Sequence, residues 1–311
     1  MSSSPHVTIL LATYNGALNL AEQLNSIENQ TYRNWSILIS DDGSTDDTRA
    51  IANQFADKGH KVTVLDGPQN GAAANFMSLI ERLPNHAVAN SWAAFCDQDD
   101  VWLPKKLERA VTMLKAADPG RPALFCSRTL ITDEALEGRR LSAPRPRPLG
   151  FRNALVQNVA AGNTIVLNQP GAHLLAGAAH EANEVVIHDW WAYQIMSGAG
   201  GQLIHDDEPA LLYRQHQVNQ IGANDSKRAK AKRIAMLLSG TYTKWNKINV
   251  AAMRCSAHRF SDENRGVLED FASLHDLPLL QRLRCLSRLG LYRQTNASTA
   301  ALWFATFTRR I

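Results

Sequence analysis

The sequence predicts an α/β fold, with a mostly parallel central sheet flanked by helices and a C-terminal helical appendage. Up to about residue 117, short runs of apolar and β-branched residues alternate with segments of helical character. This alternation is typical of a parallel sheet that helices cover on both faces. Beyond about residue 224 the segments are helical only. We therefore expect one domain over residues 1–224 and a basic helical extension over residues 225–311.

The first eight elements alternate along the chain. Strands are expected at residues 7–12, 36–40, 61–65 and 92–96, and helices at residues 17–30, 45–58, 73–83 and 105–117. Ser44 or Thr45 is a suitable cap for the second helix, and Pro104 marks the start of the fourth. These residues support the assigned helix starts.

The rest of the chain is less regular. A further strand pair is expected at residues 123–129 and 163–168, with an exposed Pro- and Arg-rich loop at residues 137–151 between them. Helices are expected at residues 226–240, 264–275 and 279–292. The last of these would place Leu279, Leu283 and Leu286 on one face.

The composition is that of an ordered globular protein, with 45% hydrophobic residues. No leader pattern precedes the first expected strand, and no run approaches the roughly 18 apolar residues of a membrane span. The four cysteines lack the spacing of a zinc site or a disulfide framework. We therefore expect a protein of the reducing cytoplasm.

The formal net charge of +4 conceals an asymmetry along the chain. From Ser226 onward, 16 Lys and Arg residues stand against 5 Asp and Glu residues, whereas the numbers before it are 17 and 24. The basic tail is a candidate for peripheral contact with an anionic membrane surface. A solvated basic helical face is the alternative. Nucleic acid is not an expected partner, because no recognition motif accompanies the charge.

Several common enzyme motifs are absent. The first expected strand leads into ATYNG, where a dinucleotide-binding fold would have G-x-G-x-x-G. G-x-x-x-x-G-K-[ST], G-x-S-x-G and H-E-x-x-H are also missing. Hydride transfer, P-loop phosphate chemistry, serine hydrolysis and zinc proteolysis are therefore disfavoured.

Acidic side chains gather where the expected parallel strands end. SDDGSTDD follows the second strand and CDQDDVW the fourth, at the edge where open parallel sheets bind ligands. Asp46 and Asp47 are interpreted as helix caps. Asp97, Asp99 and Asp100 are so close that their charges destabilise one another unless a cation compensates. Because Mg²⁺ takes one or two carboxylates plus substrate phosphates, we expect a metal and diphosphate platform here.

Five sequence blocks together resemble the family 2 glycosyltransferases of the GT-A fold, and within them the bacterial branch that includes rhamnosyltransferases. The blocks are VTILLATYNG, LNSIENQTYRNWSILISDDGSTDDT, FCDQDDVWLPKKLE, HDWW and YRQHQVNQIG. They occur over roughly residues 7–222 in the order of the family, which makes the resemblance more specific than any one block. It implies an inverting transferase that uses a nucleotide sugar and a divalent metal.

The resemblance implies a donor nucleotide site at the ends of the first strands. Tyr14 would pack on the nucleobase. Asp42, helped by Asp41, would accept hydrogen bonds from the base or the ribose. Asn70 and Gly71 would line the nucleotide in the loop after the third strand.

The resemblance also implies that Asp97 and Asp99 hold Mg²⁺ or Mn²⁺ together with the donor diphosphate, Asp99 as the more direct ligand. His216 would contact the metal or the diphosphate, and Arg214 the phosphates. Asp100 would shape the turn.

The HDWW block implies the catalytic base. Inversion needs one general base, which takes the proton of the acceptor hydroxyl as it attacks opposite the leaving diphosphate. Asp189 would be this base, and Trp190 and Trp191 would form an acceptor wall by stacking on sugars. The alternative for Asp189 is an N-cap of the following helix.

The implied function is transfer of a sugar to a saccharide or lipid-linked saccharide acceptor in cell-surface polysaccharide synthesis. The donor would be a dTDP- or UDP-sugar, with dTDP-L-rhamnose as one candidate. A sugar-1-phosphate nucleotidyltransferase is an alternative, but ATYNGALN lacks the Gly-rich, Arg-bearing loop of such enzymes. A non-catalytic nucleotide-sugar binding protein is another, although Asp97, Asp99, Asp189 and His216 are all present.

Overall fold

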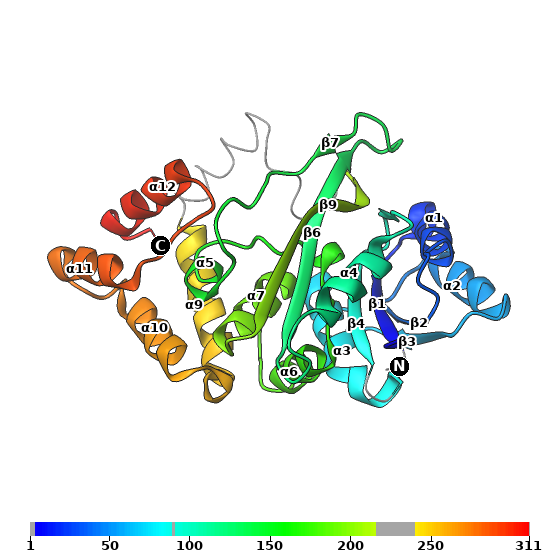
Figure 1. The fold of residues 1–311 in the computed structure, drawn as a ribbon, viewed down its shortest axis with the longest axis horizontal. Helices are drawn as coiled ribbons and strands as arrows, with labels where there is room; N and C mark the ends of the chain where they lie inside the picture. Colours follow the sequence, from blue (N-terminus) through cyan, green and yellow to red (C-terminus); the bar gives the residue numbers. More distant parts are fainter. Residues whose placement is uncertain (1–3, 89–90, 216–239, 311) are drawn as a thin grey trace.

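The computed structural model describes residues 4–88, 91–215 and 240–310. Within these residues, a nine-stranded sheet crosses the molecule and helices pack on both of its faces (Figure 1). The predicted α/β class is therefore confirmed.

The helices and strands follow one another closely along the chain. The strands are β1 Val7–Thr13, β2 Trp35–Asp41, β3 Val62–Asp66, β4 Trp92–Cys96, β5 Val101–Trp102, β6 Ala123–Thr132, β7 Arg140–Leu141, β8 Val166–Leu167 and β9 Gln202–Arg214. The helices are α1 Ala17–Glu28, α2 Thr48–Asp57, α3 Gly71–His86, α4 Lys106–Lys115, α5 Phe151–Ala154, η1 Gly162–Thr164, α6 Gln169–Ala179, α7 His188–Gly198, α9 Thr241–Cys255, η2 Ala257–Arg259, α10 Asp262–Ser273, α11 Leu279–Leu289 and α12 Asn296–Phe307.

The sheet has the strand order β3-β2-β1-β4-β8-β6-β9-β5, with β7 paired to β6. Strands β3, β2, β1 and β4 are parallel, as the sequence predicts. Beyond β4 the sheet is mixed, because β8 lies antiparallel to both β4 and β6. The strand predicted at residues 163–168 is correspondingly short, since Gly162–Thr164 forms a 3-10 turn (η1) before it.

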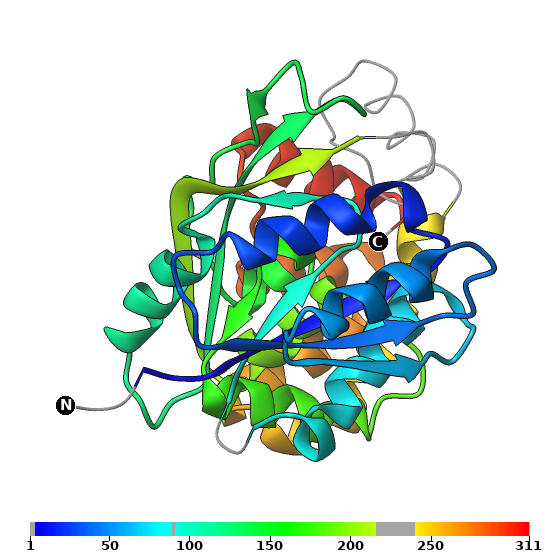
Figure 2. The ribbon, with the colours of Figure 1, turned by 90° about the vertical axis from the view of Figure 1, so that its right-hand side faces the viewer.

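Strand β1 contributes to the hydrophobic core on both faces of the sheet. Leu10 and Ala12 belong to a cluster with α3, α6 and α7, whereas Val7, Ile9 and Leu11 belong to a cluster with α1, α2 and α4. This division follows from the alternation of side chains along a strand. In Figure 2, α1 and α2 lie in front of the sheet and the C-terminal helices lie behind it.

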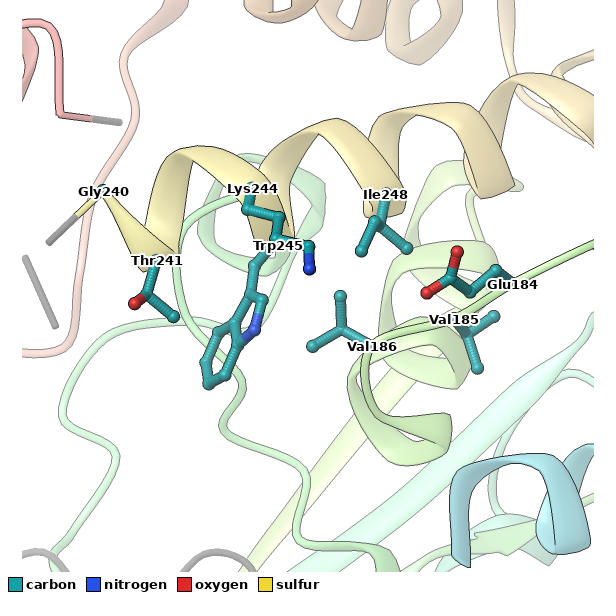
Figure 3. Close-up of a pocket in the computed structure, with 8 residues that line it drawn as sticks. All are labelled: Glu184, Val185, Val186, Gly240, Thr241, Lys244, Trp245 and Ile248. Carbon is teal, nitrogen blue, oxygen red and sulfur yellow. The ribbon is translucent and has the colours of Figure 1, made fainter. Parts of the chain in front are cut away.

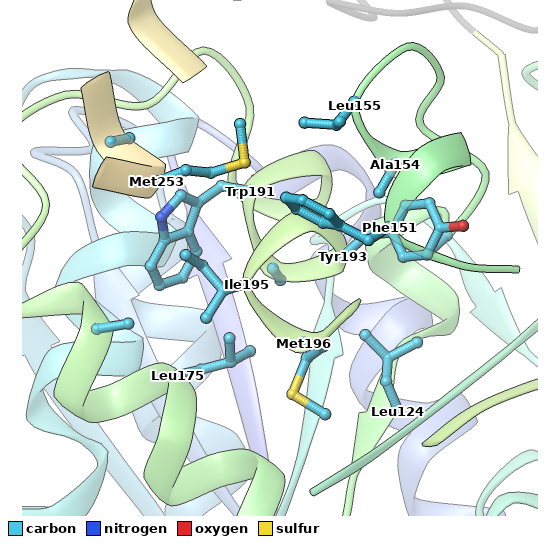
Figure 4. Packing of buried hydrophobic residues seen from close by; sticks show 14 of the residues in the cluster. Leu124, Phe151, Ala154, Leu155, Leu175, Trp191, Tyr193, Ile195, Met196 and Met253 are labelled. Carbon is cyan, nitrogen blue, oxygen red and sulfur yellow. The ribbon is translucent and has the colours of Figure 1, made fainter. Parts of the chain in front are cut away.

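The C-terminal helices share the first of these clusters. Met253 of α9 lies beside Trp191 of α7 (Figure 4), and Leu268 and Leu302 belong to the same cluster. The extension therefore packs onto the sheet domain through a continuous apolar core. The predicted boundary at residues 224 and 225, and most of the helix predicted at residues 226–240, lie outside the described residues. No helix in the described ranges is both long and apolar enough to cross a bilayer.

The leucine face expected for α11 is not the face that the helix buries. Leu279 is 39% exposed, whereas Arg282 is 1% exposed. The Arg282 guanidinium donates hydrogen bonds to the backbone carbonyl oxygens of Leu274, Leu277 and Thr306. Leu274 and Leu277 follow α10 and Thr306 lies in the last turn of α12, so Arg282 joins the ends of the two neighbouring helices.

Candidate active site

The predicted ligand edge is formed by the carboxyl ends of β1, β2 and β4. Thr13, at the end of β1, pairs with Asp41 at the end of β2. On the other side of β1, the parallel strand β4 ends at Cys96. The next residues in the chain, Tyr14 and Asp97, therefore leave the sheet at the same edge.

Asp41 is held by hydroxyl groups of the surrounding loops. It is 2% exposed and accepts hydrogen bonds from Thr13 Oγ1 at 2.9 Å and from Ser44 Oγ at 2.5 Å. Arg49 Nη1 lies 3.5 Å from the same carboxylate. Asp41 thus stabilises the turn after β2.

Asp42 organises the loop after β3. Its carboxylate accepts hydrogen bonds from the backbone N–H groups of Gln69 at 2.6 Å and Gly71 at 2.8 Å. Gly71 has a φ of +84°, a backbone conformation that glycine adopts readily. The structure therefore brings Asp42, Asn70 and Gly71 together.

Gln98 links the loop of Tyr14 to the acidic turn. Its side chain accepts a hydrogen bond from the Tyr14 N–H at 2.8 Å and donates one to the Tyr14 carbonyl at 3.0 Å. A Cβ on Gly16 would lie 2.3 Å from Gln98 Oε1, so a larger residue there would displace the Gln98 side chain from this position. The Tyr14 side chain remains 58% exposed above the linked loops.

Asp97 lies among like charges. Its pKa is raised to about 7, first by burial and then by the charges of Asp99 and Asp189, while Lys106 opposes the shift. Within the described residues, its carboxylate forms neither a hydrogen bond nor an ion pair. Asp97, which follows β4, and Asp189, at the start of α7, are therefore close enough for the charge of one to raise the pKa of the other.

These carboxylates fit a divalent cation that a ligand would share. No group of three His, Cys, Asp or Glu side chains in the described ranges is arranged as a complete metal site. Mg²⁺ nevertheless needs only one or two protein carboxylates when substrate phosphates supply further ligands. The Asp97 carboxylate, which has no partner among the described protein groups, matches such a partial donor set together with Asp99.

Asp100 points away from this cluster into the protein. It is fully buried, accepts a hydrogen bond from Asn163 Nδ2 at 2.6 Å, and accepts another from the Arg214 N–H at 3.3 Å. Burial and the neighbouring charges of Asp99 and Asp97 raise its pKa. These contacts agree with the expected role of Asp100 in shaping the turn.

Lys106, at the start of α4, is a buried cation near the same turn. Its Nζ donates a hydrogen bond to the carbonyl oxygen of Asn163 at 2.5 Å. Burial lowers the pKa of Lys106 to about 7, against the opposing effect of Cys96, Asp100 and Asp97.

Asp189 lies in the first turn of α7, two residues after the N-cap residue Ile187. It is therefore not the N-cap that the sequence left as an alternative. Its carboxylate accepts hydrogen bonds from the N–H groups of Gly162 at 2.9 Å and Trp190 at 2.6 Å. Burial raises the pKa of Asp189 to about 6, and hydrogen bonds from Asn158, Gly162 and Trp190 limit the rise.

The neighbouring His188 is a core residue. Its ring stacks on Phe76 with centroids 3.8 Å apart and planes inclined by 12°. Burial lowers the pKa of His188 to about 3, so the imidazole is neutral near pH 7. It packs the start of α7 against α3 and leaves Asp189 as the acidic group at this point.

The contacts of Arg214 contradict its predicted role as a phosphate ligand. The sequence assigns it to the donor phosphates, but its buried guanidinium donates to the carbonyl oxygens of Asp99, at 3.0 Å, and Glu134. It also forms an ion pair with Glu22. The buried Arg214 side chain thus holds the backbone of the Asp97–Asp100 turn from the protein interior.

The burial of Trp190 and Trp191 likewise contradicts the acceptor wall expected of them. Trp190 and Trp191 are 5% and 0% exposed and pack in the core, so neither indole presents a face to a sugar. The Trp190 Nε1–H donates to the Ala154 carbonyl at 2.6 Å. His216, predicted as a metal or diphosphate contact, lies outside the described residues.

A cavity lies between α9 and the segment that leads into α7 (Figure 3). Its volume is about 550 Å³, and its lining includes Glu184, Val186, Lys244 and Trp245. The half-buried Trp245 makes an edge-on contact with Trp190, with ring centroids 6.4 Å apart. The cavity is thus connected through packed aromatic rings to the helix turn that carries Asp189.

Sequence reasoning missed the roles of Gln98, Lys106, Asn163 and Gly162. One signal was present for Lys106, which shares the buried face of α4 with Leu107. A lysine on an apolar stripe is a sign of a special environment. The other three depend on contacts between segments more than 60 residues apart or on backbone approach, which no local pattern records.

An exposed tyrosine, two organised loops and converging carboxylates at one sheet edge define a candidate site for a nucleoside diphosphate ligand. A sequence model described as Glycosyl transferase family 2 matches residues 8–189, and the chain belongs to this family. It is therefore an enzyme that transfers a sugar from a nucleotide sugar.

Two relatives illustrate the range of similarity. The dTDP-rhamnosyl transferase RfbG of Shigella flexneri is 29% identical over 243 residues, which cover 75% of this chain and 81% of the relative. WfgD of Escherichia coli, a UDP-Glc:α-D-GlcNAc-diphosphoundecaprenol β-1,3-glucosyltransferase, is 26% identical over 52% of this chain and 60% of its own length. The rhamnosyltransferase-like character expected from the sequence is thereby supported.

Two solved structures share the fold. TarS of S. aureus superposes with a TM-score of 0.56 at 13% identity, over 98% of this chain and 88% of its own. The mannosyltransferase PcManGT from Pyrobaculum calidifontis, in complex with GDP-Man and Mn²⁺, gives 0.52 at 17% identity, over 99% and 88%. These likenesses confirm the predicted GT-A fold.

Proposed function

We propose that this glycosyltransferase is a metal-dependent, inverting enzyme that transfers L-rhamnose from a dTDP donor to a saccharide acceptor of a cell-surface polysaccharide. The similarity to RfbG, matched over 81% of its length, supports the donor. The mechanism rests on one observation: Asp97 lies close enough to Asp99 and Asp189 for the charges of both to act on it.

In this proposal the donor nucleotide lies at the ends of β1 and β2. The exposed Tyr14 ring would pack on the base. Asp42 and Asn70 would face the base or the ribose, and Gly71 would allow close approach of the loop backbone. Asp41 would support them indirectly, because hydroxyl groups of the protein already engage its carboxylate.

A divalent cation, Mg²⁺ or Mn²⁺, held by Asp99 and Asp97 would supply positive charge against the donor diphosphate. The Asp97 carboxylate has no partner among the described protein groups, and this and its raised pKa support the placement. PcManGT, which shares the fold, was solved with Mn²⁺. His216 remains a predicted further contact.

Asp189 would act as the general base. A carboxylate whose pKa is about 6 combines ionisation at neutral pH with useful basicity. The N–H groups of Gly162 and Trp190 fix its orientation, and it comes from a different element from the diphosphate platform. Inversion would require Asp189 to meet the acceptor on the side of the anomeric carbon opposite the leaving diphosphate.

The cavity beside α9 is the proposed acceptor site, in place of the buried Trp190 and Trp191. Trp245 would offer an aromatic surface for a sugar ring, and Glu184 and Lys244 would bind its hydroxyl groups. Val186 lines the cavity three residues before Asp189. Three residues span at most about 11 Å, so a saccharide bound there lies within reach of the base.

Peripheral membrane contact through the C-terminal helices is also proposed, because a lipid-linked acceptor would be presented there. The exposed large apolar side chains of α11 and α12 support it: Leu279, Leu280, Trp303, Phe304 and Phe307. Such a surface beside basic residues suits an anionic bilayer. The predicted cytoplasmic location stays a prediction.

A thermal-shift screen of nucleotide sugars with and without Mn²⁺ tests the proposal. A donor that binds the folded state raises the melting temperature. We expect dTDP-L-rhamnose to raise it by several degrees in the presence of Mn²⁺ only. A shift with a UDP-sugar alone would replace the proposed donor, and a shift without Mn²⁺ would contradict metal dependence.

A further inference from the structure

Lys106 is a buried basic side chain that the proposed mechanism does not use. Its side chain is 1% exposed, and its charge acts on Asp97 and Asp100. A buried ammonium is unfavourable unless strong partners compensate. Within the described residues, no carboxylate lies at ion-pair distance from its Nζ. The residue is therefore held by something other than a simple salt bridge.

The ammonium has two neutral partners. Its Nζ donates to the Asn163 carbonyl at 2.5 Å and lies 3.3 Å from the centroid of the Trp102 ring. A cation above an aromatic face is attracted by the electrons of the ring. Lys106 thus joins β5 and the start of α4 to the 3-10 turn at Gly162–Thr164.

Asn163 joins the same two segments a second time. Its Nδ2 donates to Asp100 at 2.6 Å, while its Oδ1 is buried without a partner in the described part of the chain. An unsatisfied buried acceptor is destabilising. The stabilising contact of the Asn163 side chain is therefore the hydrogen bond from its amide nitrogen to Asp100. The Asn163 backbone carbonyl and side chain are both held by residues of the segment 100–106.

The preceding residue transmits this constraint to the base. The Gly162 N–H donates to Asp189 at 2.9 Å. A Cβ on Gly162 would lie only 2.8 Å from His188 Nε2, so the turn packs against the start of α7 with no spare room. A shift of the Gly162–Asn163 peptide must therefore move Asp189 or break its hydrogen bond.

We propose that Lys106 and Asn163 are positioning residues, which fix the 3-10 turn to the Asp97–Asp100 turn and thereby hold the base Asp189 against the diphosphate platform. The inference rests on the proposed role of Asp189. It predicts that Lys106 matters for turnover, while the nucleotide site formed by β1, β2 and the loop after β3 remains intact.

Four variants test the proposal: Lys106→Met, Lys106→Arg, Asn163→Ala and, as a control on the exposed end of α4, Lys115→Met. Calorimetry gives the Kd of dTDP with Mn²⁺. Release of dTDP from dTDP-L-rhamnose, with a lipid-linked saccharide extract as acceptor, gives kcat.

We expect Lys106→Met to lower kcat by about 10- to 100-fold, as misplacement of a reacting group by a fraction of an ångström to 1 Å does, with Kd unchanged within about 2-fold. Lys106→Arg should restore most of kcat, and Lys115→Met should match the wild type. Asn163→Ala removes only the link to Asp100. If Lys106→Met does not fold, Asn163→Ala replaces it, and we expect the same loss of kcat with an unchanged Kd.

The inference would be overturned if Lys106→Met, or Asn163→Ala in its place, kept the wild-type kcat. It would also be overturned if the affinity for dTDP fell in parallel with kcat. A wild-type protein that binds dTDP but never turns over the donor would overturn the proposed function as well. The two failures are therefore distinguishable.

Discussion

Compensation of negative charge governs the candidate site at the scale of single residues. Asp41 and Asp42 are satisfied by hydroxyl and backbone N–H groups, and Asp100 by Asn163. Asp97 has no comparable partner among the described residues. Because a strained carboxylate gains most from an added cation, we expect ligand binding to act chiefly through Asp97 and its neighbour Asp99.

Replacement of Asp99 tests the metal platform. Asp99→Ala should weaken dTDP binding in the presence of Mn²⁺ by at least 10-fold, because the cation loses its more direct ligand. Without Mn²⁺, neither Asp99→Ala nor the wild type should bind dTDP measurably. Isothermal titration calorimetry measures both, with the exposed Asp207→Ala as the control. Undiminished Mn²⁺-dependent binding in Asp99→Ala would remove this residue from the metal site.

The pH dependence of stability tests the strain at Asp97. Its folded pKa of about 7 lies above the usual 3.8. The associated stability is therefore fully present below about pH 4 and is lost as pH rises through 7. In EDTA, the melting temperature of the wild type should fall a few degrees further between pH 5 and 8 than that of Asp97→Asn. Calorimetric scans that fall equally would show that Asp97 is not strained.

At the level of elements, the strands and helices up to residue 117 could be predicted except for β5, because each of the others carries its own hydrophobic periodicity and terminating residues. The expected strand at residues 36–40 is β2, and the expected helix at residues 105–117 contains α4. The 3-10 turn before β8 could not be predicted, since NTIVLN is as apolar as a strand. Its course is set by the long-range bonds of Asn163 and Gly162.

The close approach of this turn to α7 gives a prediction. Gly162→Ala should destabilise the fold by about 1–3 kcal/mol and reduce turnover, because the added Cβ meets His188 and Asp189. Gly266→Ala in α10 is the matched control, since nothing lies within 4 Å of its Cβ position. An alanine there should stabilise the helix slightly. Chemical denaturation measures both, and equal stability of the two variants would contradict the packing argument.

At the scale of the whole molecule, the sequence indicated a helical tail but not how the tail attaches. Leucine spacing alone did not show that α11 buries Arg282 and exposes Leu279, because the carbonyl oxygens that accept from Arg282 are distant in sequence or lie outside the helix. Several other tail arginines form ion pairs, such as Arg259 with Glu181 of the sheet domain. Composition alone cannot distinguish such paired charges from free ones.

The shared core predicts cooperative unfolding. Leu268 of α10 is fully buried in the cluster that includes Phe95 of β4. Leu268→Ala should therefore lower the stability of the whole protein by about 2–5 kcal/mol while leaving a single transition. Leu280→Ala, at a position 71% exposed, should change it by less than about 0.5 kcal/mol. A separate early transition of the tail helices, seen by calorimetry, would contradict a continuous core.

Asp99 and Asp189 have separate proposed roles, in metal binding and in proton transfer, and Asp189→Asn separates the two. The asparagine keeps the size of the side chain but cannot take a proton. With dTDP-L-rhamnose, Mn²⁺ and a lipid-linked acceptor, turnover should fall at least 1,000-fold, an order of magnitude set by the usual contribution of a general base, while calorimetric dTDP affinity stays within about 2-fold. Equal turnover in Asp189→Asn and the wild type would contradict the account.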